Sequence, residues 1–323
     1  MVFKAPKFWE EKNSFLSIFL LPISYIYYFT YLVYCKIKKE KIISTPVICI
    51  GNAVVGGSGK TPITIKVRNL LSKNFKNIFV LTRGYQGQNK GPLVVSKLNN
   101  HREIGDEGII HSYHGLTCIS RDRVKGAKEC QKRNADIILM DDGYQSKNVK
   151  KNLSILVVDS TYLFGNERIF PSGPLREPIN SAIEKADCVV MIGDSFNKVH
   201  LKKMLQKKIF YAEKKLITKK LKNKNIFAFC GLGNNMNFLF LLKILGLNVR
   251  EFKEFPDHYS FKNSDLKIII ECAKQNNLEI VCTRKDFVKI PENLRKFFNV
   301  ADLEIVFKQE KKFLDFLLEK TKY

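Results

Sequence analysis

The chain has 323 residues, of which 45% are apolar, so we expect one large domain or two modest domains with a buried core. Lysine and arginine number 55 against 31 acidic residues, and the formal net charge of +24 favours anionic partners such as nucleic acid, lipid headgroups or phosphorylated substrates. An AT-rich genome produces the same lysine-rich composition. The eight cysteines have no C-x-x-C spacing and lie mostly in apolar runs, which argues against a disulfide framework or a zinc site and predicts reduced core residues.

The first 40 residues are dominated by an uncharged stretch, residues 14–34, with lysines on both sides. A helix of 21 residues, at about 1.5 Å per residue, is close to the thickness of a bilayer core. Tyrosines crowd its middle and end, which suits a membrane interface. A spanning helix, an interfacial helix and an ordinary buried helix all remain open. We favour a membrane-associated N-terminal helix over residues 1–40, inserted from the cytosolic side.

From residue 45 onward, short Val- and Ile-rich runs alternate with helical stretches. This alternation predicts a mostly parallel sheet flanked by helices, which is an α/β fold. After a lysine-rich stretch a second strand–loop–helix series begins at residue 225, so we expect a main domain over 41–222 and a smaller C-terminal α/β domain over 223–323. The predicted strands of the first domain are 46–52, 77–85, 136–144, 153–160 and 187–194, and those of the second are 225–233, 247–255 and 278–287.

A glycine-rich turn follows the first predicted strand and precedes a predicted helix. Glycines let backbone N–H groups curl around an anion, and the helix N-terminus adds a partial positive charge. A lysine here reaches the β- and γ-phosphates of a nucleotide, and the next hydroxyl is placed to ligate Mg²⁺. Because Val54 replaces the first glycine of the strict pattern, the match is to the variant GG-x-GK-T of P-loop proteins. The predicted nucleotide-binding residues of the turn are Val55, Gly56, Gly57, Ser58, Gly59, Lys60 and Thr61.

Acidic side chains follow another strand of the predicted sheet. Asp141 and Asp142 end an apolar run, and the carboxyl ends of parallel strands lie beside the phosphate loop in such folds. One of them is placed to hold Mg²⁺ and the other to pair with Lys60. The alternative is an ordinary Asp-Asp-Gly turn. Asp106, taken alone, is better explained as a helix cap, and His111 with His114 has no third ligand for zinc.

Several motifs in this order resemble the tetraacyldisaccharide 4'-kinase family: VICIGNAVVGGSGKTP, LTRGYQG, GDEG, ILMDDGYQ, GPLREP, AFCGLGNNMNF and FPDHYSF. The resemblance implies that Asp106 is the catalytic base and that His258 pairs with it. This chain has Ser146 where the family usually has a histidine, and Gly108 where it usually has a proline. The resemblance further implies roles for Lys60 and Thr61 at the nucleotide and metal, for Asp141, Asp142 and Glu177 around Mg²⁺, for Arg176 near the transferred phosphate, and for Arg83, Tyr85 and Gln145 along the cleft.

The resemblance also implies a reaction and its setting. We expect the 4'-hydroxyl of a tetraacylated glucosamine disaccharide 1-phosphate to be phosphorylated with ATP and Mg²⁺, at the cytoplasmic face of the bacterial inner membrane. The expected partners are that lipid and the membrane, without nucleic acid, and the protein is expected to be a monomer. The alternatives are a P-loop NTPase or kinase with another substrate, and a basic scaffold that binds membrane or nucleic acid, which predicts steeply salt-dependent binding.

Overall fold

The computed structural model describes residues 6–56, 59–96, 98–193, 204, 206–218, 221, 223–233, 235–257 and 259–321. The chain forms two compact units, a larger one of Pro6–Glu213 with Ile305–Tyr323, and a smaller one that includes Lys214–Glu304. Two strands, β8 and β12, carry the chain from one unit into the other. The sequence places the boundary near residue 222 and the chain end in the smaller domain, whereas here the last helix belongs to the larger unit.

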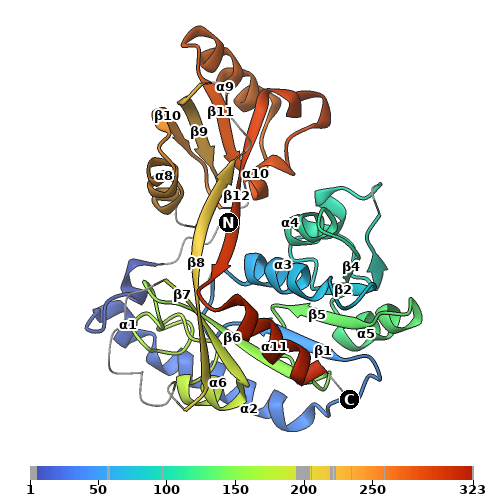
Figure 1. Cartoon of the computed structure of the whole chain (residues 1–323). Coiled ribbons are helices and arrows are strands. Elements are labelled where there is room, and N and C mark those ends of the chain that lie inside the picture. The colour runs from blue at the N-terminus through green and yellow to red at the C-terminus, as the bar shows by residue number, and fades with distance from the viewer. Residues whose placement is uncertain are drawn as a thin grey trace. The chain divides into compact units, whose positions relative to one another are not determined.

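The larger unit is built on a sheet with the strand order β8-β7-β6-β1-β5-β2-β4-β3 (Figure 1). Its strand pairs are parallel except β3 with β4. The order places β1 between β5 and β6, so the carboxyl ends of β1 and β5 are neighbours. The strands are β1 Val47–Gly51, β2 Ile78–Thr82, β3 Leu93–Val94, β4 Thr117–Ile119, β5 Ile137–Asp141, β6 Leu153–Asp159, β7 Cys188–Ile192 and β8 Lys208–Thr218.

Helices cover both faces of this sheet, and side chains alternate between two apolar cores. Ile48 and Ile50 of β1 belong to the core under α3 and α11, while Cys49 belongs to the core under α5 and α6. Burial on both faces explains why the central strands are continuous apolar runs. The helices of the larger unit are η1 Lys7–Trp9, α1 Phe15–Phe19, α2 Leu21–Ile37, α3 Lys60–Leu71, α4 His101–Ser112, α5 Arg123–Lys132, α6 Ile179–Lys185 and α11 Glu310–Thr321.

The smaller unit has the parallel strand order β10-β9-β11-β12 and a core rich in phenylalanine. The predicted strands of this region correspond to β9, β10 and β11, whereas β12 was not predicted. Its elements are β9 Asn225–Cys230, α8 Asn235–Ile244, β10 Asn248–Glu254, α9 Asn263–Gln275, β11 Glu279–Thr283, α10 Arg284–Phe287, η2 Glu292–Phe297 and β12 Phe298–Phe307. The predicted α/β fold with a second, smaller α/β unit is confirmed.

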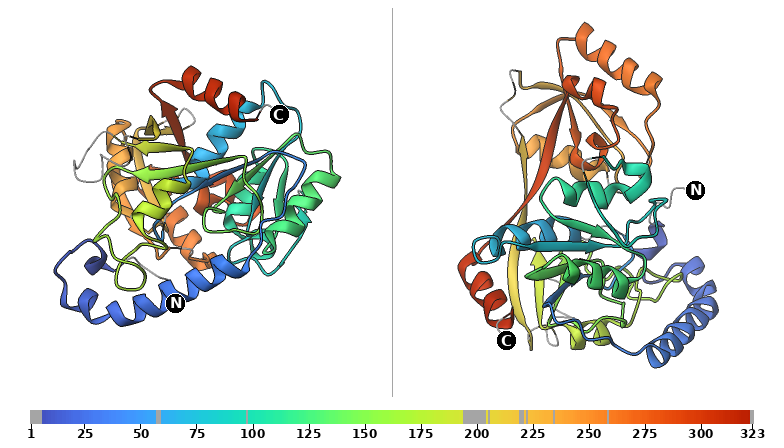
Figure 2. Two further views of the ribbon diagram at one scale, coloured as in Figure 1. Left: turned by 90° about the horizontal axis from the view of Figure 1, so that it is seen from below. Right: turned by 90° about the vertical axis from the view of Figure 1, so that its right-hand side faces the viewer.

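The apolar N-terminal segment, drawn in blue in Figure 2, forms two helices rather than one, and Leu20 alone separates α1 from α2. Their buried side chains are polar: Ser17 and Ser24 are 0% and 4% exposed. Ser24 donates to the Ile169 carbonyl at 2.8 Å, and Asn166 donates to Ser17 at 2.9 Å. Within the described residues, no helix combines the length and the apolar character needed to cross a bilayer.

Candidate active site

The phosphate loop connects β1 to α3. Gly59 has φ of +83°, a left-handed conformation that suits glycine, and it is the residue before α3 begins. The Val55 N–H donates to the Pro174 carbonyl at 2.7 Å, so the start of the loop is fixed by a second segment of the chain. Lys60 is buried and donates to the Gly56 carbonyl at 3.2 Å, which folds its ammonium group back over the loop. Gly57 and Ser58 lie outside the described residues.

Asp141, the last residue of β5, meets both α3 and α4. Its Oδ2 accepts a hydrogen bond from the Thr61 hydroxyl at 3.1 Å and lies 2.7 Å from Nε2 of His111. Both His111 and Asp141 are 0% exposed. Asp141 Oδ1 is buried and has no hydrogen-bond partner in the structure. The sequence predicts the proximity of Asp141 and Thr61, but it gives no signal for His111 beyond a helical position.

Asp142 carries the charge contacts of the site. Its carboxylate accepts from the Arg176 guanidinium at 2.8 and 3.3 Å and lies 3.7 Å from the Lys60 ammonium. Burial alone raises its pKa, but Lys60 and Arg176 overcome that effect and hold the pKa of Asp142 at about 2. Asp142 also has φ of +53°, which turns the chain sharply after β5. The carboxylate is therefore ionised and places two cations beside the phosphate loop.

Arg123, a buried residue at the start of α5, was not predicted. Its guanidinium donates to the Leu81, Asp141 and Asp142 carbonyls at 3.2, 2.9 and 3.2 Å. These contacts link the end of β2 to the end of β5, where Asp141 and Asp142 lie. A signal for such a residue is absent from the sequence because the contacts are to backbone atoms of distant segments.

Glu177 joins the site to the N-terminal helices. It is 0% exposed, pairs with Lys185, and accepts from Ser181 at 3.0 Å and from Tyr31 of α2 at 3.4 Å. Gln145 donates to its Oε1 at 3.2 Å and to the Asn52 carbonyl at 2.8 Å. Both carboxylate oxygens of Glu177 therefore accept protein hydrogen bonds in this structure.

Helix α4 carries the predicted base. A kink at Gly105, with φ of +78°, divides the helix, and a Cβ there would lie 2.2 Å from the Tyr85 carbonyl. Asp106 begins the second half and is 7% exposed. Glu107 accepts from Thr82 at 3.3 Å, and burial together with the nearby Asp141 and Asp142 raises its pKa.

Two other predicted residues border this helix. Arg83 and Tyr85 are exposed and flank the kink of α4, since a Cβ at Gly84 would lie 3.2 Å from the Ile104 carbonyl. His258 lies outside the described residues. Its neighbour Asp257 pairs with Lys285 at 2.7 Å within the smaller unit.

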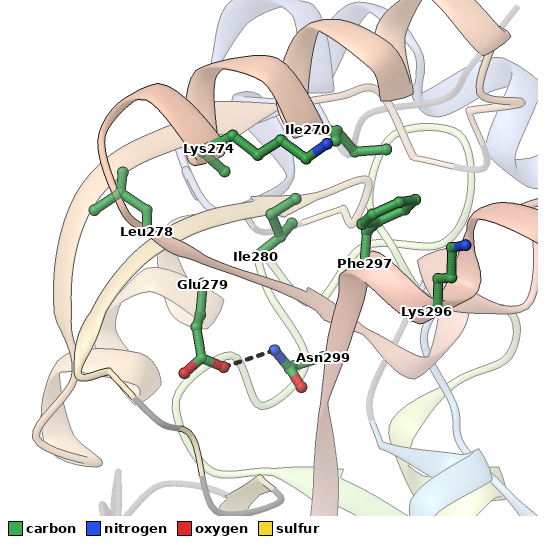
Figure 3. Close-up of a pocket in the computed structure, with 9 residues that line it drawn as sticks. Ile270, Lys274, Leu278, Glu279, Ile280, Lys296, Phe297 and Asn299 are labelled. Carbon is green, nitrogen blue, oxygen red and sulfur yellow. Dashed lines mark hydrogen bonds between the residues drawn. The ribbon is translucent and has the colours of Figure 1, made fainter.

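A cavity of about 390 Å³ lies in the smaller unit, lined by α9, β11, the end of η2 and the start of β12 (Figure 3). Its wall combines apolar side chains with Lys274, Lys296 and a hydrogen bond of 3.0 Å from Asn299 to Glu279. None of the predicted catalytic residues that the structure describes lines this cavity.

The donors beside the phosphate loop fit a hard cation. The Thr61 hydroxyl and the unpartnered Asp141 Oδ1 are oxygen donors, which Mg²⁺ prefers. The described residues include no cluster of three or more His, Cys, Asp or Glu side chains arranged for a metal ion. A cation bound mainly through phosphate oxygens and water needs few protein ligands.

A mostly parallel sheet carries a Gly-rich loop between a strand and a helix, a buried lysine, and two aspartates at the end of a neighbouring strand. Together these features define a P-loop nucleotide-binding protein of the phosphotransferase type. The profile of the family described as Tetraacyldisaccharide-1-P 4'-kinase matches residues 16–322. The chain belongs to this family.

Known relatives cover nearly the whole chain. A tetraacyldisaccharide 4'-kinase of Bartonella quintana (strain Toulouse) is 36% identical over 321 residues, which cover 96% of this chain and 93% of that protein. A tetraacyldisaccharide 4'-kinase of Rickettsia canadensis (strain McKiel) is 35% identical, and the match covers 88% of this chain and 87% of that protein. The crystal structure of LpxK from Aquifex aeolicus in complex with ATP aligns with a TM-score of 0.76 at 28% identity, over 95% of this chain and all of that one.

Proposed function

We propose that the protein transfers the γ-phosphate of ATP to the 4'-hydroxyl of a tetraacylated glucosamine disaccharide 1-phosphate. The observation that carries this proposal is the group formed by Lys60, Asp142 and Arg176, with Thr61 and Asp141 beside it, at the neighbouring ends of β1 and β5. Family membership supplies the acceptor, because the curated relatives are named for that disaccharide.

The nucleotide is bound by the loop and its lysine. Backbone N–H groups of the loop and the Lys60 ammonium bind the β- and γ-phosphates, and Arg176 stabilises negative charge on the transferred group. Thr61 and Asp141 would hold Mg²⁺, and the bound ion would supply positive charge that neutralises the phosphates. Asp142 keeps Lys60 and Arg176 in place. A relative of the same family was crystallised with ATP, which supports ATP as the donor.

Asp106 acts as the base in this scheme. It accepts the proton of the 4'-hydroxyl while the hydroxyl oxygen forms a bond to the γ-phosphorus, and the bond from that phosphorus to the bridging oxygen of ADP breaks. Its position after the Gly105 kink, on the helix that His111 ties to Asp141, supports this role. We also propose that His258 takes part in the transfer, and a His258→Gln variant with wild-type transfer rates would remove this role.

We further propose that α1 and α2 bind the cytoplasmic face of the inner membrane, where the acylated acceptor resides. Their protein-facing side chains include the buried serines, while Phe15, Phe19 and Phe29 are 82%, 67% and 66% exposed. An apolar surface of this kind on a lipid-modifying enzyme suits the bilayer interface. We propose a monomer in which an N-terminal membrane segment over 1–40 precedes the P-loop domain and the smaller domain.

The test uses purified protein, ATP, Mg²⁺ and the acylated disaccharide 1-phosphate, followed by mass spectrometry. The expected product carries one added phosphate at the 4' position. Asp106→Asn keeps the shape of the side chain and is expected to lower the rate on the order of 100-fold or more, since it removes general base catalysis. Absence of the phosphorylated lipid with folded, ATP-binding protein would refute the proposed acceptor.

A further inference from the structure

His111 is a buried histidine whose side chain makes its polar contact with Asp141 of the candidate active site and not with solvent. Its Nε2 lies 2.7 Å from Asp141 Oδ2, and neither side chain is accessible to water. Its other ring nitrogen, Nδ1, has no hydrogen-bond partner in the structure. The imidazole is therefore placed for one polar interaction, with the carboxylate that also accepts from Thr61.

The two contacts on Asp141 use the same oxygen. Thr61 and His111 both approach Oδ2, from α3 and α4 respectively, so the carboxylate cannot rotate without breaking one of them. Oδ1 is left buried and without a protein partner. A buried carboxylate oxygen without a hydrogen bond is energetically costly unless another group donates to it. A water molecule bound to Mg²⁺ would be such a group.

His111 is held from both sides. Its backbone carbonyl accepts from Arg68 of α3 at 3.1 Å, while its side chain reaches Asp141 at the end of β5. The same helix carries Asp106 and Glu107 one turn earlier. One residue thus connects the phosphate-loop helix, the acidic strand end and the helix of the proposed base.

We propose that His111 is a positioning residue that fixes the Asp141 carboxylate for Mg²⁺-nucleotide binding and holds α4 in register with it. This inference rests on the proposed use of Mg²⁺-ATP. His111 touches neither nucleotide nor acceptor in this scheme, and it acts through Asp141. Partners of metal ligands of this kind change metal affinity or activity by about 10- to 100-fold when removed.

The test compares His111→Leu, which keeps the bulk but removes the donor, with His111→Gln, whose amide keeps a donor at similar reach. ADP binding is measured by calorimetry with MgCl₂ and with EDTA. For His111→Leu we expect the affinity with MgCl₂ to fall about tenfold or more and the affinity in EDTA to stay within threefold of wild type. His111→Gln is expected to stay within threefold in both.

His114→Gln, at an exposed histidine just beyond the end of α4, is the matched control and is expected to bind as wild type. If His111→Leu does not fold, His111→Asn takes its place, because its shorter amide does not reach Asp141. The inference is overturned if ADP binding by His111→Leu depends on Mg²⁺ as in wild type, or if this variant loses the same affinity with MgCl₂ as with EDTA. Absence of any Mg²⁺ effect in the wild-type protein would instead remove the proposed function.

Discussion

Removing the exposed phenylalanines of α1 and α2 is expected to release the protein from membranes. Phe15, Phe19 and Phe29 together expose about the equivalent of two complete side chains. Transfer of one phenylalanine out of water contributes roughly 1.5–3 kcal/mol, and the lower value applies because an interface stays partly hydrated. Triple substitution by serine therefore removes about 3 kcal/mol, which is on the order of a 100-fold weaker partition.

The assay is flotation with vesicles that contain anionic phospholipid, at a fixed salt concentration because the protein is strongly basic. The matched control replaces Met236, Phe240 and Ile244 of α8, which are 59%, 60% and 66% exposed in the smaller unit, and is expected to change the partition less than threefold. Both variants are expected to keep their thermal stability, since exposed side chains contribute little to folding. Wild-type partition of the phenylalanine variant, or an equal loss in the control, would refute the assignment of α1 and α2 as the membrane-binding surface.

Two predictions concern the charges of the site. Arg176→Met is expected to lower the free energy of unfolding by about 1 kcal/mol at pH 6. Because the depressed pKa of Asp142, about 2, stabilises the fold only above the unfolded value, the deficit shrinks as the pH falls from about 4 to 2. Urea denaturation at pH 6 and pH 2.5 measures it, and an equal deficit at both would contradict the role of this pair. Glu107→Gln is expected to have a pH dependence of the opposite sign, because the pKa of Glu107 is raised in the folded protein. A carboxyl with a raised pKa contributes stability at low pH that is lost as the pH rises. The variant is therefore expected to gain stability relative to wild type between pH 4 and pH 8. A difference that does not depend on pH would mean that Glu107 ionises normally.

Local sequence patterns determined much of the fold and of the nucleotide site. Continuous Val and Ile runs predicted β1, β2, β5, β6 and β7, because strands covered on both faces have no polar side. The phosphate loop was predictable because glycine geometry and helix starts depend on neighbouring residues. The position of Asp141 and Asp142 followed from the rule that ligands bind at the carboxyl ends of parallel strands.

Tertiary packing decided which side chains complete the site. His111 and Arg123 contact Asp141 and Asp142 from helices distant in sequence, and Glu177 accepts from Lys185, Ser181 and Gln145. Such contacts leave no periodic signal, because they depend on how separate elements are packed. The resemblance to a family could assign Glu177 a place near the metal, but its hydrogen bonds are a property of the folded chain.

The N-terminal segment shows most clearly which properties follow from the sequence and which depend on tertiary packing. Its sequence established that residues 14–34 carry no charge and are mostly apolar. Only the folded chain shows that Ser17 and Ser24 face the protein while the phenylalanines face outward. Hydrophobicity is a property of each residue, whereas burial is decided by which other elements pack against it, so the direction of this surface was available only from the tertiary structure.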